Sequence, residues 1–455
     1  MKQKKDCKLS IQIVIIAMLA LCLTTLNLLA SDQVPAPKQD HPIALVGGTI
    51  HTVRGETIAN GTVVFVDGKI TALGKDVALP EGTEQIEIED KHVYPGLIAA
   101  NTVLGLVEIN AVRATRDFAE VGDVNPNVRA EVSINPDSEL LPVARANGIT
   151  AALSIPTGGL ISGTSALIML DGWTWEALTL KAPIGLHVRW PAMGVSRSPF
   201  VTKSKEEQLK ERDKNLQKIR DAFAEARAYL RAKEAEAKEG VPYHDTDLRW
   251  EAMIPVLKKE IPVFVHANEI RQIQAAMDWA SEEDIKMVLV GGQDAWRVAD
   301  LLKEKNVPVI VGGTHRLPMR RWEAYDTPFT LPLKLYEAGV TFCIATQGGS
   351  FGAAHERNLP YQAAMAAAYG LPKEEALKAV TLYPAQILGV AGQVGSLEVG
   401  KDATLIVTDG DPLEITTNVE WEFIQGRKID LSSRHTQLYQ KYKTKYQRMG
   451  LTNGR

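Results

Sequence analysis

The middle of the chain alternates short apolar strands with helical stretches, and this alternation constrains the fold most. The runs that read as strands are 149–155, 166–170, 184–188, 263–265, 286–290, 307–311 and 340–345. Helices are expected at 281–284, at 298–305 and, as one long charged helix, over 204–240. In that long helix, apolar residues recur at spacings of three, four and seven, which gives one buried stripe. Strands separated by helices form parallel sheets, so the pattern predicts a parallel α/β core.

The segments on either side of this core are rich in strands instead of helices. Strand-like runs occur at 43–46, 61–66 and 69–73 and again at 403–407 and 421–427. Asp67 and Gly68 form a typical hairpin turn between two of these runs. We therefore expect 41–95 and 395–430 to build one small composite β-sandwich, beside a core domain over 96–394.

The first thirty residues have the pattern of an export signal. Four lysines precede an apolar run over 11–21, and small residues surround Ala30. We expect a signal peptide over 1–30, then a linker over 31–40, and an exported protein that is periplasmic or secreted. The alternative is a retained membrane anchor. After cleavage Cys343 is the only cysteine, so no internal disulfide is expected.

Charge and length limit the function classes. The 455 residues are enough for a large barrel plus an accessory domain. The net charge of −4 includes +3 from 1–30, so the remainder carries −7. This mild acidity argues against a nucleic-acid partner. The segment 431–455 is a polar, basic tail in which no chemistry is recognisable.

Four segments carry a resemblance to a known family. They are Val-Tyr-Pro-Gly-Leu-Ile at 93–98, Ile-Pro-Val-Phe-Val-His-Ala-Asn at 261–268, and two longer blocks at 376–389 and 394–407. With these motifs the chain resembles the amidohydrolase superfamily, in particular its imidazolonepropionase-like branch, over nearly all of the mature sequence. The resemblance implies a (β/α)8 TIM-type barrel with a composite β-sandwich formed by both termini. It also implies hydrolysis of non-peptide C–N bonds in cyclic or related amides.

The same resemblance implies a metal site at the C-terminal ends of the barrel strands. Family members commonly hold one or two divalent ions there, usually zinc, on a His-x-His pair, two further histidines and an Asp. In this chain Asn101 and Val103 stand at the first-strand positions, Gly291 at the sixth and Gln347 at the eighth, while His266 remains on the fifth. Amides bind metals weakly, and Gln cannot act as a carboxylate base. The sequence therefore predicts an atypical, metal-poor site.

The candidate catalytic residues are His266 and His315. His315 follows the strand-like run 307–311, from which it either approaches His266 across the barrel mouth or lies in a loop. Asn101, Asn268 and Gln347 form a neutral hydrogen-bonding set that suits substrate binding. No resident cofactor is expected, and the alternative is one weakly bound zinc ion at His266.

Two other polar residues have ordinary structural interpretations. His187 lies on an apolar run, where a packed or hydrogen-bonded core role is favoured over a role in the site. Glu269 either assists His266 in acid–base chemistry or caps the helix that follows it, and capping is favoured.

Three function classes remain open. The first is a hydrolase of non-peptide C–N bonds with an altered site. The second is a catalytically silent barrel that acts as an exported small-molecule binding or partner protein. In either case the expected partner is a small amide-like molecule, with a homo-oligomer left open and no stable membrane insertion after signal cleavage. A different reaction run without metal is a third reading.

Overall fold

A computed structural model describes residues 33–196, 198, 200–236 and 242–451. The predicted signal peptide over 1–30 lies outside these residues. The chain from Pro35 onward forms one compact unit. Among the described residues, none of the helices combines the length and apolar character that a membrane span requires.

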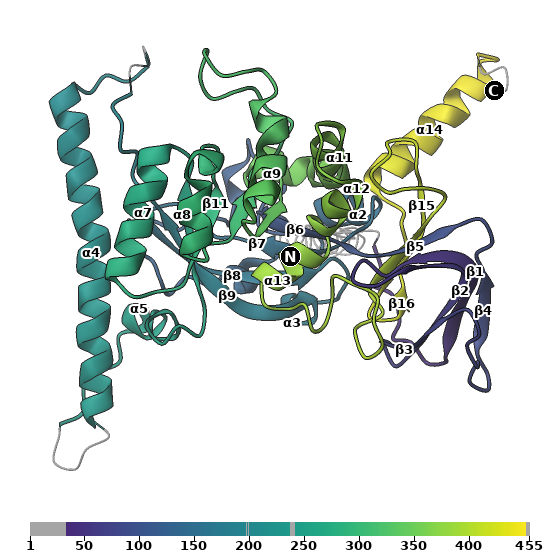
Figure 1. Cartoon of the computed structure of the whole chain (residues 1–455). Helices are drawn as coiled ribbons and strands as arrows, with labels where there is room; N and C mark the ends of the chain where they lie inside the picture. The colour runs from purple at the N-terminus through teal and green to yellow at the C-terminus, as the bar shows by residue number, and fades with distance from the viewer. Residues whose placement is uncertain (1–32, 197, 199, 237–241, 452–455) are drawn as a thin grey trace, which may run out of the picture. The chain divides into compact units, whose positions relative to one another are not determined.

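The core is an eight-stranded sheet in the order β13-β12-β11-β10-β9-β8-β7-β6 (Figure 1). Its strands are β6 (Leu97–Thr102), β7 (Ile149–Ser154), β8 (Ile161–Met169), β9 (Thr179–Arg189), β10 (Val263–Ala267), β11 (Met287–Gly291), β12 (Val309–Val311) and β13 (Phe342–Ile344). Strands β9 to β13 pair in parallel, and so do β6 and β7. The predicted TIM-type barrel is confirmed.

The prediction of a wholly parallel core is wrong at β8, which runs antiparallel to both β7 and β9. The reason lies in the connections. Only 155–160 joins β7 to β8, and the segment 170–178 with the one-turn helix α3 (Trp175–Leu178) joins β8 to β9. A parallel crossover needs a dozen or more residues, so these links permit only antiparallel pairing.

A short backbone segment lies between the two end strands of the barrel sheet. The Ile98 N–H on β6 donates to the Val380 carbonyl at 2.9 Å. The Ile344 N–H on β13 donates to the neighbouring Ala379 carbonyl, also at 2.9 Å. This segment therefore connects β6 to β13. All barrel strands except β8 run in the same direction, so their C-terminal ends lie at one rim of the barrel.

Several helices cover the barrel sheet on its outside (Figure 1). Besides α3, eleven helices among the described residues of 96–394 lie between the barrel strands or follow the last of them in sequence. They are α2 (Leu140–Arg145), α4 (Lys205–Glu236), α5 (Leu248–Glu251), α6 (Ile254–Leu257), α7 (Ile270–Glu282), α8 (Ala299–Glu304), α9 (Thr327–Ala338), α10 (Ser350–Ala354), α11 (Leu359–Ala368), α12 (Lys373–Lys378) and α13 (Leu382–Ile387), with short 3-10 turns η1 (Arg113–Thr115), η2 (Ala130–Ser133), η3 (Ala295–Val298) and η4 (Glu356–Asn358). The long α4 buries the predicted stripe, including Ile219, Phe223 and Ala226. The Phe223 ring packs edge-on against the Trp279 ring of α7, with ring centroids 4.9 Å apart.

Both terminal β segments build a second sheet. Its strands are β1 (Ile43–His51), β2 (Thr57–Val66), β3 (Lys69–Gly74), β4 (Glu84–Glu87), β5 (His92–Pro95), β14 (Leu405–Thr408), β15 (Val419–Ile424) and β16 (Arg427–Lys428). The two halves join where β5 pairs antiparallel with β14. Phe65 and Phe423, one from each half, pack at 5.1 Å in a shared apolar core. The composite domain is thus held by its backbone ladder and by its core.

A buried ionic cluster fixes this second sheet to the barrel. Asp171, after β8, accepts a hydrogen bond from Arg145 of α2 at 3.1 Å and one from Arg427 of β16 at 2.7 Å. Asp171 is almost fully buried, so its charge depends on these two cations. The last helix among the described residues is α14 (Arg434–Arg448), which lies in the predicted polar tail.

Candidate functional site

The carboxyl ends of two adjacent parallel strands place a pair of histidines at the barrel mouth. His187 lies on β9 and His266 on β10, and in the ladder His266 is the register partner of Arg189. His187 Nδ1 and His266 Nε2 are 3.0 Å apart, a hydrogen bond between two imidazole rings. His187 also stacks on Phe264 with ring centroids 4.9 Å apart. His187, expected in a packed or hydrogen-bonded role, is therefore tied directly to the main site candidate.

Both imidazoles are neutral in this setting. Burial lowers the pKa of His187 to about 3, and the nearby Arg189 cation acts in the same direction. Burial, Arg189 and His187 hold the pKa of His266 well below its ordinary value. A pair of neutral rings shares one N–H, so one ring donates and the other accepts. Near neutral pH the two rings therefore offer an imidazole nitrogen with a free lone pair next to an imidazole N–H.

Three buried polar atoms at this end of the barrel have no hydrogen-bond partner among the described residues. They are His187 Nε2, Asn101 Oδ1 and Asn268 Oδ1. Buried polar atoms without partners are rare in folded proteins, and they mark places where a ligand or an ordered water supplies the missing bond. The two amide oxygens are acceptors, so they suit N–H or O–H groups of a bound molecule.

Two glycines position the asparagine side chains. Gly291 has φ +96°, and a Cβ there would lie 2.5 Å from Asn268 Oδ1. Gly348 has φ +66°, and a Cβ there would lie 2.2 Å from Asn101 Nδ2. The side-chain amides of Asn268 and Asn101 therefore pack directly against the glycine backbone, where any larger residue would displace them. At Gly291, where the family pattern implies a histidine, the side chain of Asn268 already fills the space.

The eighth-strand position differs from what the sequence indicated. Gln347 is exposed, and the neighbouring Thr346 is buried. The Thr346 hydroxyl contacts both carboxyl oxygens of Glu356, at 3.0 and 2.9 Å, and Thr102 of β6 bonds the same carboxyl. Burial raises the pKa of Glu356 to about 8. The sequence does not indicate Glu356, because no motif marks it. It reaches the site from the segment after β13, which folds back toward the barrel.

His315 lies in the segment after β12 and is exposed. Its backbone N–H donates to Gln362 Oε1 at 2.8 Å, and its side chain bonds the backbone of Tyr361. Within the described chain no hydrogen bond joins His315 to His266, whose ring is bonded to His187 instead. Glu269 caps α7, with its side chain and that of Gln272 exchanging bonds with the backbone, so the capping prediction is confirmed.

The family's metal set does not fit the residues at this site. A catalytic zinc needs about three His, Cys or carboxylate ligands. The residues that the structure describes contain no group of three or more His, Cys, Asp or Glu side chains able to hold an ion. Val103 is buried without a donor atom, and His266 Nε2 is already bonded to His187. A zinc ion at His266 would find this imidazole as the one remaining residue of the family pattern, which is fewer than a catalytic zinc needs.

A family model and the most similar known proteins agree on one family. A model described as "Amidohydrolase family" matches residues 144–429. The chain is 22% identical over 391 residues to "Amidohydrolase tasK" of Hapsidospora irregularis, which covers 79% of this chain but only 38% of that relative. It is 23% identical over 393 residues to an imidazolonepropionase of Brucella anthropi, covering 80% of this chain and 90% of the relative.

Solved structures show the same architecture. An amidohydrolase from Thermotoga maritima MSB8 superposes with a TM-score of 0.75 at 27% identity, covering 85% of this chain and 99% of that one. A prolidase complexed with N-methylphosphonate-L-proline has a TM-score of 0.52 at 16% identity, covering 86% and 99%. The second likeness shows the fold alone.

Proposed function

The chain belongs to the amidohydrolase family, and we propose that it hydrolyses a non-peptide C–N bond of a small cyclic or related amide at a metal-poor site. Members of this family are hydrolases. The observation that carries the proposal is the buried, neutral pair formed by His187 and His266 at the rim of the barrel. Enzymes of this fold place their chemistry at that rim.

The imidazole pair supplies acid–base chemistry. The ring with the free lone pair takes a proton from the attacking water, and the same proton then goes to the departing nitrogen. His187 and His266 hold that proton between them, which offsets part of the cost of forming a buried cation. A positioned acid–base group contributes about 10²- to 10⁴-fold in rate.

Arg189 supplies the positive charge. In the described part of the chain it forms no salt bridge, and burial lowers its pKa without an acidic partner to counter it. A guanidinium without a partner stabilises the oxyanion that develops when water adds to an amide carbonyl. The free Oδ1 atoms of Asn101 and Asn268 accept N–H groups of the substrate, which fixes its orientation.

The test combines metal analysis with turnover. The purified protein is assayed on hydantoin-, imidazolone- and dipeptide-like amides before and after chelation, and its zinc content is measured. We expect turnover that chelation leaves unchanged and that His266→Asn lowers by about 10²-fold or more. The matched control is His355→Gln, an exposed histidine in the loop after α10, which should keep full activity. Stoichiometric zinc that is lost in His266→Asn together with activity would overturn the proposal.

A second function is favoured by the loss of metal ligands on three strands, at Asn101 and Val103, Gly291 and Gln347. In this alternative the barrel is an exported binding protein that holds a small amide without cleaving it. Calorimetry with the same panel distinguishes the two. Binding that His266→Asn weakens, with no turnover of any bound compound, would support the silent barrel. Turnover of a bound compound would exclude it.

A further inference from the structure

The C-terminal helix α14 is a surface element that the barrel does not use. Its N-cap is Ser433, whose side chain accepts a hydrogen bond from the Thr436 N–H in a capping box. His435 near its start bonds to Arg357 of η4 at 3.2 Å, which anchors that end. Beyond this point the helix extends away from the rest of the described chain (Figure 1). None of its residues is buried, so its side chains contribute nothing to either core.

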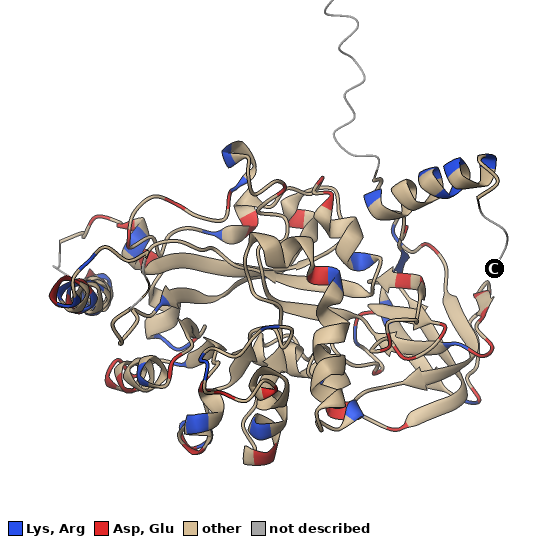
Figure 2. Ribbon diagram, turned by 90° about the horizontal axis from the view of Figure 1, so that it is seen from above, with Lys and Arg blue, Asp and Glu red and all other residues tan. Residues whose placement is uncertain are grey.

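All the charged residues of α14 are basic. It carries no acidic residue and five cations, Arg434, Lys441, Lys443, Lys445 and Arg448. Figure 2 shows this end of the chain with blue segments and no red ones. None of the five forms a salt bridge with a described residue. Since the whole chain has a net charge of −4, all other residues together carry −9. The cations of α14 therefore stand apart from an acidic protein.

An exposed aromatic stripe runs along the same helix. Tyr439, Tyr442 and Tyr446 recur at spacings of three and four, which places them on one face. They are 61%, 47% and 45% exposed, and Met449 continues the stripe at 58%. Three tyrosines in a row on an unpacked helix are not explained by folding, because no core covers them.

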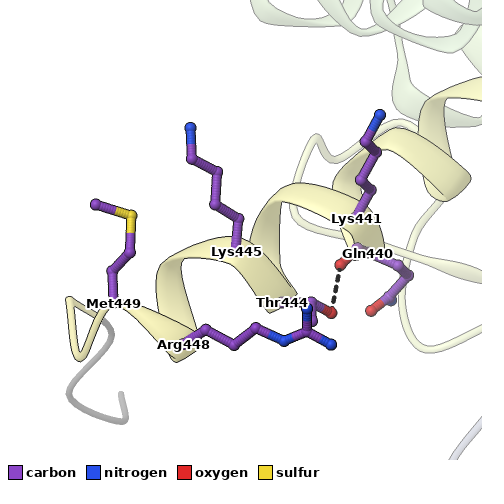
Figure 3. A pocket seen from close by; sticks show the side chains of 6 residues that line it. All are labelled: Gln440, Lys441, Thr444, Lys445, Arg448 and Met449. Carbon is purple, nitrogen blue, oxygen red and sulfur yellow. Dashed lines mark hydrogen bonds between the residues drawn. The ribbon is translucent and has the colours of Figure 1, made fainter.

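Lysines flank the stripe. The ammonium group of Lys443 lies 5.6 Å from the Tyr439 ring, and that of Lys445 lies 5.8 Å from the Tyr446 ring. Figure 3 shows Lys441 and Lys445 projecting from the same side of the helix. Aromatic rings with lysine stems beside them match the boundary between lipid headgroups and acyl chains, where rings sit at the interface and ammonium groups reach the phosphates.

We propose that α14 docks onto the surface of an anionic membrane with its axis in the plane of the bilayer. Its fifteen residues give a rod about 22 Å long, with one edge apolar and aromatic and the flanks basic. Amphipathic helices of this kind bind by shallow burial plus attraction to anionic lipids. A basic helix can also lie in the major groove of duplex DNA, where polar and charged side chains contact bases and phosphates, whereas α14 presents a stripe of three tyrosines and Met449. That stripe favours a lipid interface, and binding to an oligonucleotide is measured as a competing outcome.

The experiment is vesicle flotation of the full chain. Vesicles of phosphatidylcholine alone are compared with vesicles that also contain phosphatidylglycerol. The apolar run at 11–21 is present in every sample, so binding to neutral vesicles is the common background. The test variant is Lys441→Gln/Lys445→Gln/Arg448→Gln. We expect wild type to prefer anionic vesicles and the variant to lose on the order of 100-fold in partitioning, about fivefold per charge.

The matched control removes three exposed lysines from another helix, as Lys205→Gln/Lys210→Gln/Lys214→Gln on α4. It changes the net charge equally and should keep wild-type binding. Far-UV circular dichroism and thermal unfolding of both variants should match wild type, because neither set is buried. Three results would overturn the proposal: equal wild-type binding to both vesicle types, equal loss in both variants, or tighter binding to an oligonucleotide than to anionic vesicles.

Discussion

Acid should destabilise this protein through a buried imidazole, and His187 allows the size of the effect to be calculated. Burial lowers the pKa of His187 to about 3 from an ordinary value of 6.5. The unfolded chain therefore takes up a proton below pH 6.5 while the folded chain does not. The stabilising contribution is complete above the unfolded pKa and is lost as pH falls toward the folded one. Between about pH 6.5 and pH 4.5 the loss is about 2 kcal/mol.

The substitution His187→Asn removes this proton-binding group from both states. Its free energy of unfolding should lie below that of wild type near neutrality, and the gap should shrink by about 2 kcal/mol as the pH falls from 6.5 to 4.5. Guanidinium chloride unfolding, followed by tryptophan fluorescence across this range, measures the gap directly. Phe223→Leu is the matched control, because it shortens a buried ring that packs on Trp279 but leaves the imidazole and the ring stacked on it. The control curve should run parallel to wild type. A constant gap for His187→Asn would refute the reasoning.

Three further predictions follow from buried groups. Asp171→Asn leaves the Arg427 cation without its carboxylate. It should lower the free energy of unfolding, measured by thermal unfolding, by about 3–5 kcal/mol. Burial raises the pKa of Glu356 to about 8, above its unfolded value, so its stabilising contribution declines as pH rises from about 4.5 to 8. Glu356→Gln should therefore gain stability over wild type in urea at pH 9 but not at pH 4. Gly348→Ala places a Cβ at φ +66° against Asn101 and should lower the melting temperature, with a loss of about 1–3 kcal/mol.

The barrel was predictable because its strands and helices have different apolar spacings, and spacing is a local property. The direction of β8 does not follow from its composition, since a short apolar run has the same composition whichever way it runs. The lengths of 155–160 and 170–178 contained the missing information, because neither can hold a crossover helix. Connection length is thus the sequence feature that distinguishes this mixed sheet from a wholly parallel one.

The site was less predictable than the barrel. The sequence predicts His266, because a motif places it at the end of a strand. Its partner His187 depends on the register between β9 and β10, and a single sequence contains no register. Glu356 depends on a loop that folds back onto Thr102 and Thr346 across the barrel seam. Residues that come together through tertiary contacts of this kind are found only from coordinates.

Backbone conformation and packing fix the residues at two of the positions where the family pattern implies metal ligands. At Gly291 the backbone has φ +96°, which disfavours any side chain, and Asn268 Oδ1 lies where a Cβ would project. Val103 is fully buried in the barrel core, so an imidazole there would replace apolar contacts with a buried polar ring. Placing histidines at Gly291 and Val103 would therefore require changes in backbone conformation and in core packing together.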